Sequence, residues 1–298
     1  MTQNTIFDSE IVAPDPDLTK REATLVGFTD RYLRIHDQLR LLFQADQLSG
    51  WSRRFHRTDL PIAARVADQY PLVIFHGDVG TGKTAVAECA ANRLLAESRS
   101  EESMIFRLSN RVRGSGKVGE MGTLLSEALK RVSVSAGRNR RAVLIIDEAD
   151  SIAASRSQDQ SHHEDKVAVN TLIQGIDDLR QFNGRVVVIL CTNRLSVVDP
   201  ALVRRAALIE EFARPSDAER AELLGMDLDG LSVSPANVGE LVAITGPREG
   251  RPGWTYSDFR TRFYPAAVAR AFPDRALDFA ILKETASAIA PSRVMEDR

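Results

Sequence analysis

The chain has 298 residues, of which 43% are hydrophobic and 27% are charged, and its formal net charge is −2. This composition is typical of a globular protein with a sizeable core and one large or two modest domains. The near-neutral charge disfavours a protein whose main role is to coat nucleic acid, although a local basic patch stays possible.

The sequence contains no recognisable disulfide framework, secretory signal or membrane-spanning segment. Its two cysteines, Cys89 and Cys191, lack metal-ligand spacing and are expected to be free thiols in a reducing compartment. The N-terminus has no basic and apolar secretory pattern, and no apolar run approaches the roughly 18–20 residues that span a bilayer. We therefore expect a cytoplasmic protein without a membrane partner.

The N-terminal part is predicted to be helical after a short tail. Residues 1–19 lack apolar periodicity and are expected to be mobile or loosely docked. From Lys20 onward, apolar residues recur three or four positions apart, which predicts an amphipathic packing helix. Its buried face would contain Phe28, Tyr32, Ile35, Leu39, Leu42 and Phe43. A second helical stretch is predicted between Trp51 and Gln69.

A phosphate-binding loop follows a short apolar strand, 72–75, and precedes a helix that begins near Ala85. Glycines allow backbone N–H groups to surround phosphates, and the helix N-terminus favours negative charge. The side chain of Lys83 would hold the β- and γ-phosphates, and the Thr84 hydroxyl would bind Mg²⁺. The residues expected to contact ATP or GTP here are Gly77, Asp78, Val79, Gly80, Thr81, Gly82, Lys83, Thr84 and Ala85.

Three further apolar runs predict strands, at 104–108, 142–146 and 185–193, with helices between them. The second run ends in Asp147 and Glu148, at the edge of a parallel sheet where ligands bind. We expect Asp147 to hold Mg²⁺ and Glu148 to orient or deprotonate the attacking water. For this stretch alone, solvated acids at a strand end are an equally good interpretation.

The third strand and the short helix after it supply the remaining candidate catalytic residues. Asn193 at the strand end could donate a hydrogen bond to the γ-phosphate or the water, although asparagine is also a common turn residue. Arg204 and Arg205 follow the short helix, and an arginine fork suits transition-state phosphate charge. Placed far from their own loop, they would act on the ATP of a neighbouring subunit, with Arg205 favoured and Arg204 kept alongside.

Taken in this order and spacing, these motifs resemble the Walker A, Walker B, sensor-1 and second-region-of-homology elements of AAA+ ATPases. The resemblance implies an α/β fold: an AAA+ P-loop NTPase core with a parallel sheet flanked by helices, plus a small α-helical lid domain. We predict a tail over 1–19, a large nucleotide-binding domain over 20–214 and the lid over 215–298. It also implies ATP and Mg²⁺ as cofactors and a homo-oligomer, usually a hexameric ring.

Within AAA+, the chain looks most similar to HORMA-domain remodellers of the pachytene-checkpoint family. The residues that suggest this are at 115–118, 169–177, 201–206 and 215–216. The resemblance implies an ATPase that partly unfolds a HORMA-domain protein. For bacterial relatives it implies regulation of a cyclic-oligonucleotide-producing nucleotidyltransferase in antiphage defence.

Other roles are carried over position by position. Val26 and Gly27 resemble the site that packs on adenine, and the loop from Arg113 to Gly119 would line the pore. This loop lacks the usual aromatic residue, which leaves Val112, Arg113 and Val118 as candidates for gripping substrate. Ser257 stands where these remodellers carry the sensor-2 arginine, and Arg260 is a possible substitute.

Two other classes of function stay open. The first is a nucleic-acid motor, because residues 147–150 spell the motif of one RNA helicase group. Those helicases need a second RecA-like domain, and fewer than 90 residues follow Pro215, so a DNA-associated AAA+ loader or motor is the more serious version, although nucleic acid is an unexpected partner. The second is a nucleotide-dependent scaffold that binds ATP without hydrolysing it. The presence of Lys83, Asp147 and Glu148 together argues against this scaffold.

Overall fold

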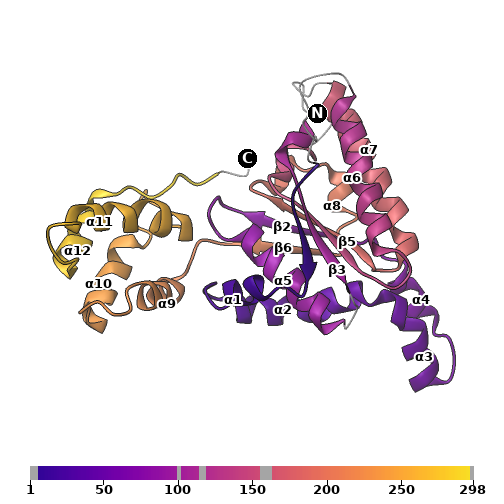
Figure 1. Ribbon diagram of the computed structural model, residues 1–298, viewed down its shortest axis with the longest axis horizontal. Coiled ribbons are helices and arrows are strands. Elements are labelled where there is room, and N and C mark those ends of the chain that lie inside the picture. Colours follow the sequence, from indigo (N-terminus) through magenta and orange to yellow (C-terminus); the bar gives the residue numbers. More distant parts are fainter. Residues whose placement is uncertain (1–5, 99–101, 114–118, 155–162, 296–298) are drawn as a thin grey trace. The chain divides into compact units, whose positions relative to one another are not determined.

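The computed structural model describes residues 6–98, 102–113, 119–154 and 163–295. These form two compact units. Among these residues, the first unit lies within 6–76 and 84–211, and the second lies within 77–83 and 212–295. The first unit is an α/β structure and the second is mainly helical (Figure 1). The division into 1–19, 20–214 and 215–298 stays a prediction.

A six-stranded sheet, in the order β1-β3-β4-β5-β2-β6, is the centre of the α/β structure. Its strands are β1 (Phe7–Ala13), β2 (Leu72–Gly77), β3 (Ser103–Leu108), β4 (Ala142–Ile146), β5 (Val186–Thr192) and β6 (Leu208–Phe212). The pairs β2/β5, β3/β4 and β4/β5 are parallel. The predicted parallel sheet flanked by helices is therefore confirmed, with one antiparallel strand at its edge.

That antiparallel strand corrects the prediction of a loosely docked tail. Strand β1 pairs along β3, with Glu10 opposite Phe106 and Ala13 opposite Ser103. Exposed and partly buried side chains alternate between its two buried ends, as expected for an edge strand with one face in water. Asp15 then caps helix α1 (Pro16–Glu22) and hydrogen-bonds Asn92, so this segment is anchored to the core.

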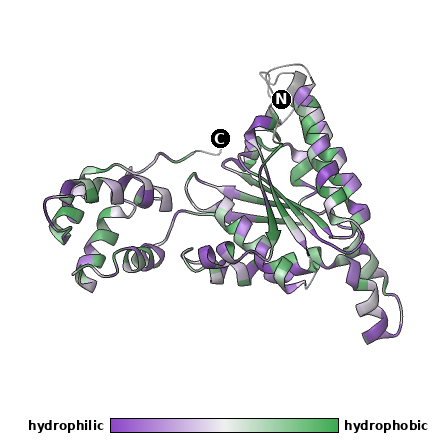
Figure 2. Cartoon of the chain, viewed as in Figure 1, coloured by the Kyte–Doolittle hydropathy of each residue, from purple (hydrophilic) through white to green (hydrophobic). Residues whose placement is uncertain are grey.

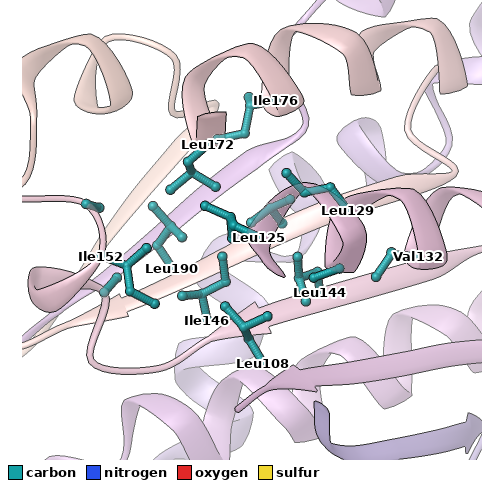
Figure 3. Packing of buried hydrophobic residues seen from close by; sticks show 14 of the residues in the cluster. Leu108, Leu125, Leu129, Val132, Leu144, Ile146, Ile152, Leu172, Ile176 and Leu190 are labelled. Atoms are coloured by element: carbon teal, nitrogen blue, oxygen red, sulfur yellow. The ribbon is translucent and has the colours of Figure 1, made fainter. Parts of the chain in front are cut away.

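The inner strands are buried because they are almost entirely apolar. Every residue of β4 and β5 is buried, as predicted for strands covered on both faces. On one face, Leu144 and Ile146 of β4 and Leu190 of β5 belong to the same cluster as Leu125 of α6 (Glu120–Ala136) and Leu172 of α7 (His163–Leu179) (Figure 3). This packing holds the carboxyl ends of the strands, where the candidate site lies, on a rigid base.

Helices α2 (Phe28–Phe43) and α5 (Lys83–Glu97) lie on the other side of the sheet from α6 and α7 (Figure 1). The buried residues of α2 are Phe28, Tyr32, Ile35, Leu39, Leu42 and Phe43, the same six that periodicity predicts. The helix begins later than Lys20 because Gly27 adopts a left-handed conformation, with φ of 67°.

The second predicted helical stretch consists of two helices, α3 (Leu48–His56) and α4 (Pro61–Ala67). Arg57, in the left-handed region, ends the first, and Pro61 begins the second. Ser52 joins them, since its hydroxyl donates to the Thr58 carbonyl and accepts from the Leu60 amide. A short helix, α8 (Pro200–Val203), precedes β6.

The helical part of the second unit comprises α9 (Asp217–Asp227), α10 (Pro235–Thr245), a π-helical turn (Asp258–Phe263), α11 (Tyr264–Ala271) and α12 (Phe279–Ala288). Ser216 and Glu219 form a capping box that fixes the start of α9. The small core of this helical part contains Trp254, Phe259 and Phe263, whose rings pack edge to face. Figure 2 shows that these helices carry mixed hydropathy, whereas the strands are mostly hydrophobic.

Candidate functional site

The phosphate loop lies between the end of β2 and the start of α5. Glycines at 77, 80 and 82 have φ of 141°, 77° and 94°, which side-chain-bearing residues rarely adopt. The Lys83 ammonium donates to the carbonyl oxygens of Gly77 and Asp78 at 2.9 and 2.8 Å. The Thr81 hydroxyl also donates to the Asp78 carbonyl, at 2.8 Å. The loop therefore curls around its own lysine, as its motif requires.

Two of these glycines are also required by close packing. A Cβ on Gly77 would lie 2.2 Å from the carbonyl oxygen of Phe212, and one on Gly80 would lie 2.4 Å from the Ser257 Cβ. The Ser257 amide donates to the Gly80 carbonyl at 3.2 Å. Ser257, predicted from the sensor-2 position, thus contacts the phosphate loop directly.

At the carboxyl end of β4, Asp147 meets the first turn of α5. One of its carboxylate oxygens accepts from the Thr84 hydroxyl at 2.9 Å, and the other accepts from the Glu148 amide at 2.9 Å. A hydroxyl and a carboxylate held together are oxygen ligands that Mg²⁺ prefers, with the remaining positions filled by water and phosphate. The two residues therefore fit the predicted metal role.

Glu148 occupies a strained position next to them. Its backbone is in the left-handed region, with φ of 48° and ψ of 43°, and its side chain is exposed. Such strain in a residue other than glycine is common at functional sites because it aims a side chain that regular structure would turn away. The Ser151 hydroxyl bonds the Glu148 carbonyl at 2.7 Å and supports this turn.

Asn193 directly follows β5 at the same edge of the sheet. The register pairs Leu190 with Ile146 of β4 and pairs Thr192 with His76 of β2. The asparagine therefore comes off the sheet between the strand that precedes Asp147 and the strand that precedes the loop. This is the place that the sequence predicts for it.

The two candidate arginines differ sharply. The Arg205 guanidinium makes a bidentate pair with Asp177, through Nε at 2.7 Å and Nη2 at 3.0 Å, and lies 5.1 Å from the centre of the Tyr70 ring. Hydrogen bonding to Asp177 raises the pKa of Arg205. Arg204 is exposed, and its side chain makes no hydrogen bond or ion pair within residues 6–98, 102–113, 119–154 and 163–295.

The remaining predicted positions are less directly placed. Val26 and Gly27 lie just before α2, whose Arg31 donates at 3.0 Å to the carbonyl of Glu211 in β6. Arg260, the possible substitute for a sensor-2 arginine, lies 3.8 Å from the Asp227 carboxylate. Ser257 is placed against Gly80 of the phosphate loop through its amide.

The predicted pore loop lies largely outside the described residues, including Val118. The side chain of Arg113 is also outside them. The prediction that Val112 grips substrate is wrong, because this residue is only 1% exposed and belongs to the core cluster. A short turn, Asn110–Arg113, directs it inward.

Comparisons with known proteins identify the family of this chain. The model of the ATPase family associated with various cellular activities, AAA, matches residues 73–214. "CD-NTase-associated protein 6" from Escherichia coli strain KTE188 is 62% identical over 297 residues, covering 100% of both chains. The chain belongs to the AAA ATPases. Another relative of that name, from strain MS 115-1, is 37% identical, and the match covers 98% of this chain and 97% of that one.

Solved structures of AAA proteins are also similar. A chain of the "E. coli MS115-1 HORMA:CdnC:Trip13 complex" has a TM-score of 0.88 and 35% identity, with 97% of both chains covered. Trip13 from Rhizobiales has a TM-score of 0.72 and 31% identity, covering 96% of this chain and 99% of that one. Within the residues that the structure describes, no helix is both long and apolar enough to cross a membrane.

One residue at the phosphate loop escapes sequence reasoning. The Arg214 Nε donates to an Asp78 carboxylate oxygen at 2.7 Å, although 136 positions separate the two residues. In the sequence, Pro215 indicates only a domain boundary, and Arg214 before it belongs to no recognisable motif. An acidic residue inside the loop is the one sequence signal that calls for a cationic partner.

Proposed function

We propose that this chain is a ring-forming ATPase that uses ATP hydrolysis to remodel a HORMA-domain protein, and thereby regulates a cyclic-oligonucleotide-producing nucleotidyltransferase. The observation that carries the proposal is the contact between Thr84 and Asp147 beside a glycine-rich loop. The fold around it matches one chain of the HORMA:CdnC:Trip13 complex, with 97% of both chains covered. The name CD-NTase-associated protein 6, which two of the relatives carry, supports the link to a nucleotidyltransferase.

The chemistry follows from where the side chains lie. Backbone N–H groups of the loop and the Lys83 ammonium would hold the β- and γ-phosphates. Thr84 and Asp147 would hold Mg²⁺, which when bound draws charge from the phosphate oxygens. Glu148 would accept the proton of the attacking water, and Asn193 would orient that water or the γ-phosphate.

The final component would come from a neighbouring subunit. A guanidinium that approaches the γ-phosphate stabilises the charge that spreads over its oxygens in the transition state. Arg204 is exposed and available for such a contact, whereas Arg205 already holds Asp177. We therefore place Arg204 in the trans role and Arg205 in support of it, which reverses the preference drawn from sequence.

The experiment that tests this function uses the Glu148→Gln variant, which should bind ATP but hydrolyse it slowly. Native mass spectrometry with and without ATP should reveal a nucleotide-dependent hexamer. A persistent monomer in both conditions would contradict the ring mechanism and favour a nucleotide-binding scaffold.

The substrate is tested separately by measuring the ATPase rate of the unmodified protein. A purified HORMA-domain protein should stimulate hydrolysis, and double-stranded DNA should not. A salt-sensitive stimulation by DNA alone would instead support a DNA-associated loader.

A further inference from the structure

Asp78 is an unexpected residue in a loop that binds phosphate. Its carboxylate would repel the negative charges of a nucleotide unless another group neutralised it. One oxygen accepts from Arg214 Nε at 2.7 Å, and the other accepts from the Met295 amide at 2.9 Å. The side chain is only 11% exposed, so water screens this charge weakly.

Arg214 is well placed to supply that neutralisation. It lies on the short connector between β6 and α9, and its side chain is 13% exposed. Its Nη1 donates to the Gly253 carbonyl at 2.6 Å, which fixes the guanidinium against the segment that leads to Ser257. Its Nη2 is buried and has no hydrogen-bond partner among the described residues.

We propose that Arg214 is a positioning residue for the phosphates of the nucleotide: it cancels the charge of Asp78 and holds the phosphate loop in its binding conformation. This inference rests on the proposed function, because it requires that the loop bind ATP. It assigns to Arg214 a role that Ser257 and Arg260 do not fill, since Ser257 carries no charge and Arg260 lies beside Asp227.

The size of the effect follows from the charges. Removal of Arg214 would leave a poorly hydrated carboxylate next to the bound phosphates. We expect binding of an ATP analogue to weaken by about 10- to 100-fold, with a smaller loss for ADP, which carries less negative charge. Removal of the Asp78 charge as well should cancel most of this loss, because nothing then remains to be neutralised.

The test is a double-mutant cycle in the full-length protein, with the affinity for a non-hydrolysable ATP analogue and for ADP measured by calorimetry. The variants are Arg214→Gln, Asp78→Asn and the pair of both. Arg270→Gln is the matched control, because Arg270 pairs with Glu284 at 2.6 Å in the same unit, and neither residue belongs to the loop or to the contacts of Asp78. The expected results are a selective loss of ATP affinity in Arg214→Gln, recovery to within about threefold in the double variant, and no change in the control.

Three outcomes would overturn the proposal. The first is unchanged ATP affinity in Arg214→Gln, and the second is a double variant as weak as Arg214→Gln, which would mean a direct contact between Arg214 and phosphate. The third is an equal loss for ATP and ADP with a lower melting temperature, which would mean a merely structural role. If the protein without substitutions bound no nucleotide, the proposed function itself would fail instead.

A variant that keeps the positive charge at position 214 separates a loss of charge from a loss of folding. Arg214→Lys should preserve the preference for ATP over ADP even if its stability falls, because the ammonium still faces the carboxylate. Loss of this preference in Arg214→Lys would contradict the proposal.

Discussion

The Thr84 hydroxyl donates a 2.9 Å hydrogen bond to Asp147, which lies 63 positions further along the chain. This contact joins the helix after the phosphate loop to the end of the buried strand β4. It depends on packing far from the site, because the apolar residues of β4 and β5 fix where the strand ends. The rigidity of the sheet therefore determines the geometry of the proposed metal ligands.

We expect Asp147→Asn to lower Mg²⁺-dependent ATP hydrolysis by about 100-fold or more, because a bound metal supplies several kcal/mol of transition-state stabilisation. Binding of ATP in the presence of EDTA should stay close to normal. Steady-state ATPase assays and equilibrium binding check the two parts. Asp178→Asn, at an exposed carboxylate of α7, is the control, and a normal rate in Asp147→Asn would exclude the metal role.

Substitutions of the two arginines after α8 should affect stability and catalysis differently. Arg205→Ala removes a bidentate pair and a ring contact, so the free energy of unfolding should fall by about 1–3 kcal/mol. Arg204→Ala removes no side-chain hydrogen bond or ion pair among the described residues and should change the free energy of unfolding by less than about 0.5 kcal/mol. Urea unfolding measures both.

The same variants make a second distinction in the assembled protein. Arg204→Ala should lower the ATPase rate of the oligomer while leaving its mass unchanged, because the transition state loses a cation. If Arg204→Ala retained full activity and Asp177→Asn raised it, Arg205 would be the residue that reaches the neighbour, and our assignment would be reversed.

The close approach of Ser257 to Gly80 predicts a difference between two glycines of the same loop. Alanine at either Gly80 or Gly82 is strained by about 1–2 kcal/mol because φ is positive. Only at Gly80 does the added Cβ also meet another side chain, and at Gly82 nothing lies within 4 Å. Gly80→Ala should therefore destabilise the protein by about 1–3 kcal/mol more than Gly82→Ala.

Scanning calorimetry measures that difference, and a second substitution tests its cause. Ser257→Gly should recover part of the stability lost in Gly80→Ala, although the Thr255 hydroxyl at 2.9 Å limits the recovery. The same change should do nothing for Gly82→Ala. Equal effects of the two alanine substitutions would show that strain alone decides, without the Ser257 contact.

Much of the fold is readable from the sequence where the pattern is strong. In β4 and β5 an uninterrupted apolar run predicts a buried strand. In α2 the six buried residues recur three or four positions apart, which predicts a helix with one buried face. Strand β1 escapes detection because its side chains alternate only weakly and it contains three polar residues. Its place in the sheet depends on backbone pairing with β3, which no local pattern encodes.

In the candidate site, too, some residues can be recognised from the sequence and others cannot. Lys83, Thr84 and Asp147 are recognisable because phosphate and metal chemistry demand those residue types at that spacing. The pairing of Arg205 with Asp177 and of Arg214 with Asp78 is set by tertiary packing across 28 and 136 positions. Sequence reasoning therefore identifies the groups that touch the ligand better than those that hold them in place.

A buried carboxylate in the helical unit predicts how stability depends on pH. Asp258 is 1% exposed and accepts hydrogen bonds from the Thr255 amide at 2.9 Å and from the Ser292 hydroxyl at 2.5 Å. Burial by itself would raise its pKa, but these hydrogen bonds outweigh burial and hold the pKa below the ordinary value of 3.8. The charged form is thus favoured by folding.

The sign of the effect follows from that depressed pKa. The unfolded chain binds a proton at Asp258 more readily than the folded chain, so the stabilisation is fully present above about pH 3.8 and is lost as pH falls through the lower folded pKa. Near neutral pH, Asp258→Asn should lower the free energy of unfolding by about 1.5–3 kcal/mol, because hydrogen bonds to a charged acceptor are replaced by weaker ones. Below pH 3.8 the difference between the two proteins should shrink.

Urea unfolding of both proteins between pH 3 and pH 7 measures this difference directly, and other acid-sensitive groups cancel in the comparison. Asp229→Asn, at an exposed carboxylate of the same unit, should show a difference near zero at every pH. A constant offset between Asp258→Asn and the unsubstituted protein across the whole range would mean that shape rather than charge accounts for the role of Asp258. Because Ser292 lies shortly before Met295, whose amide binds Asp78, a true charge effect would also loosen the C-terminal segment from the phosphate loop in acid.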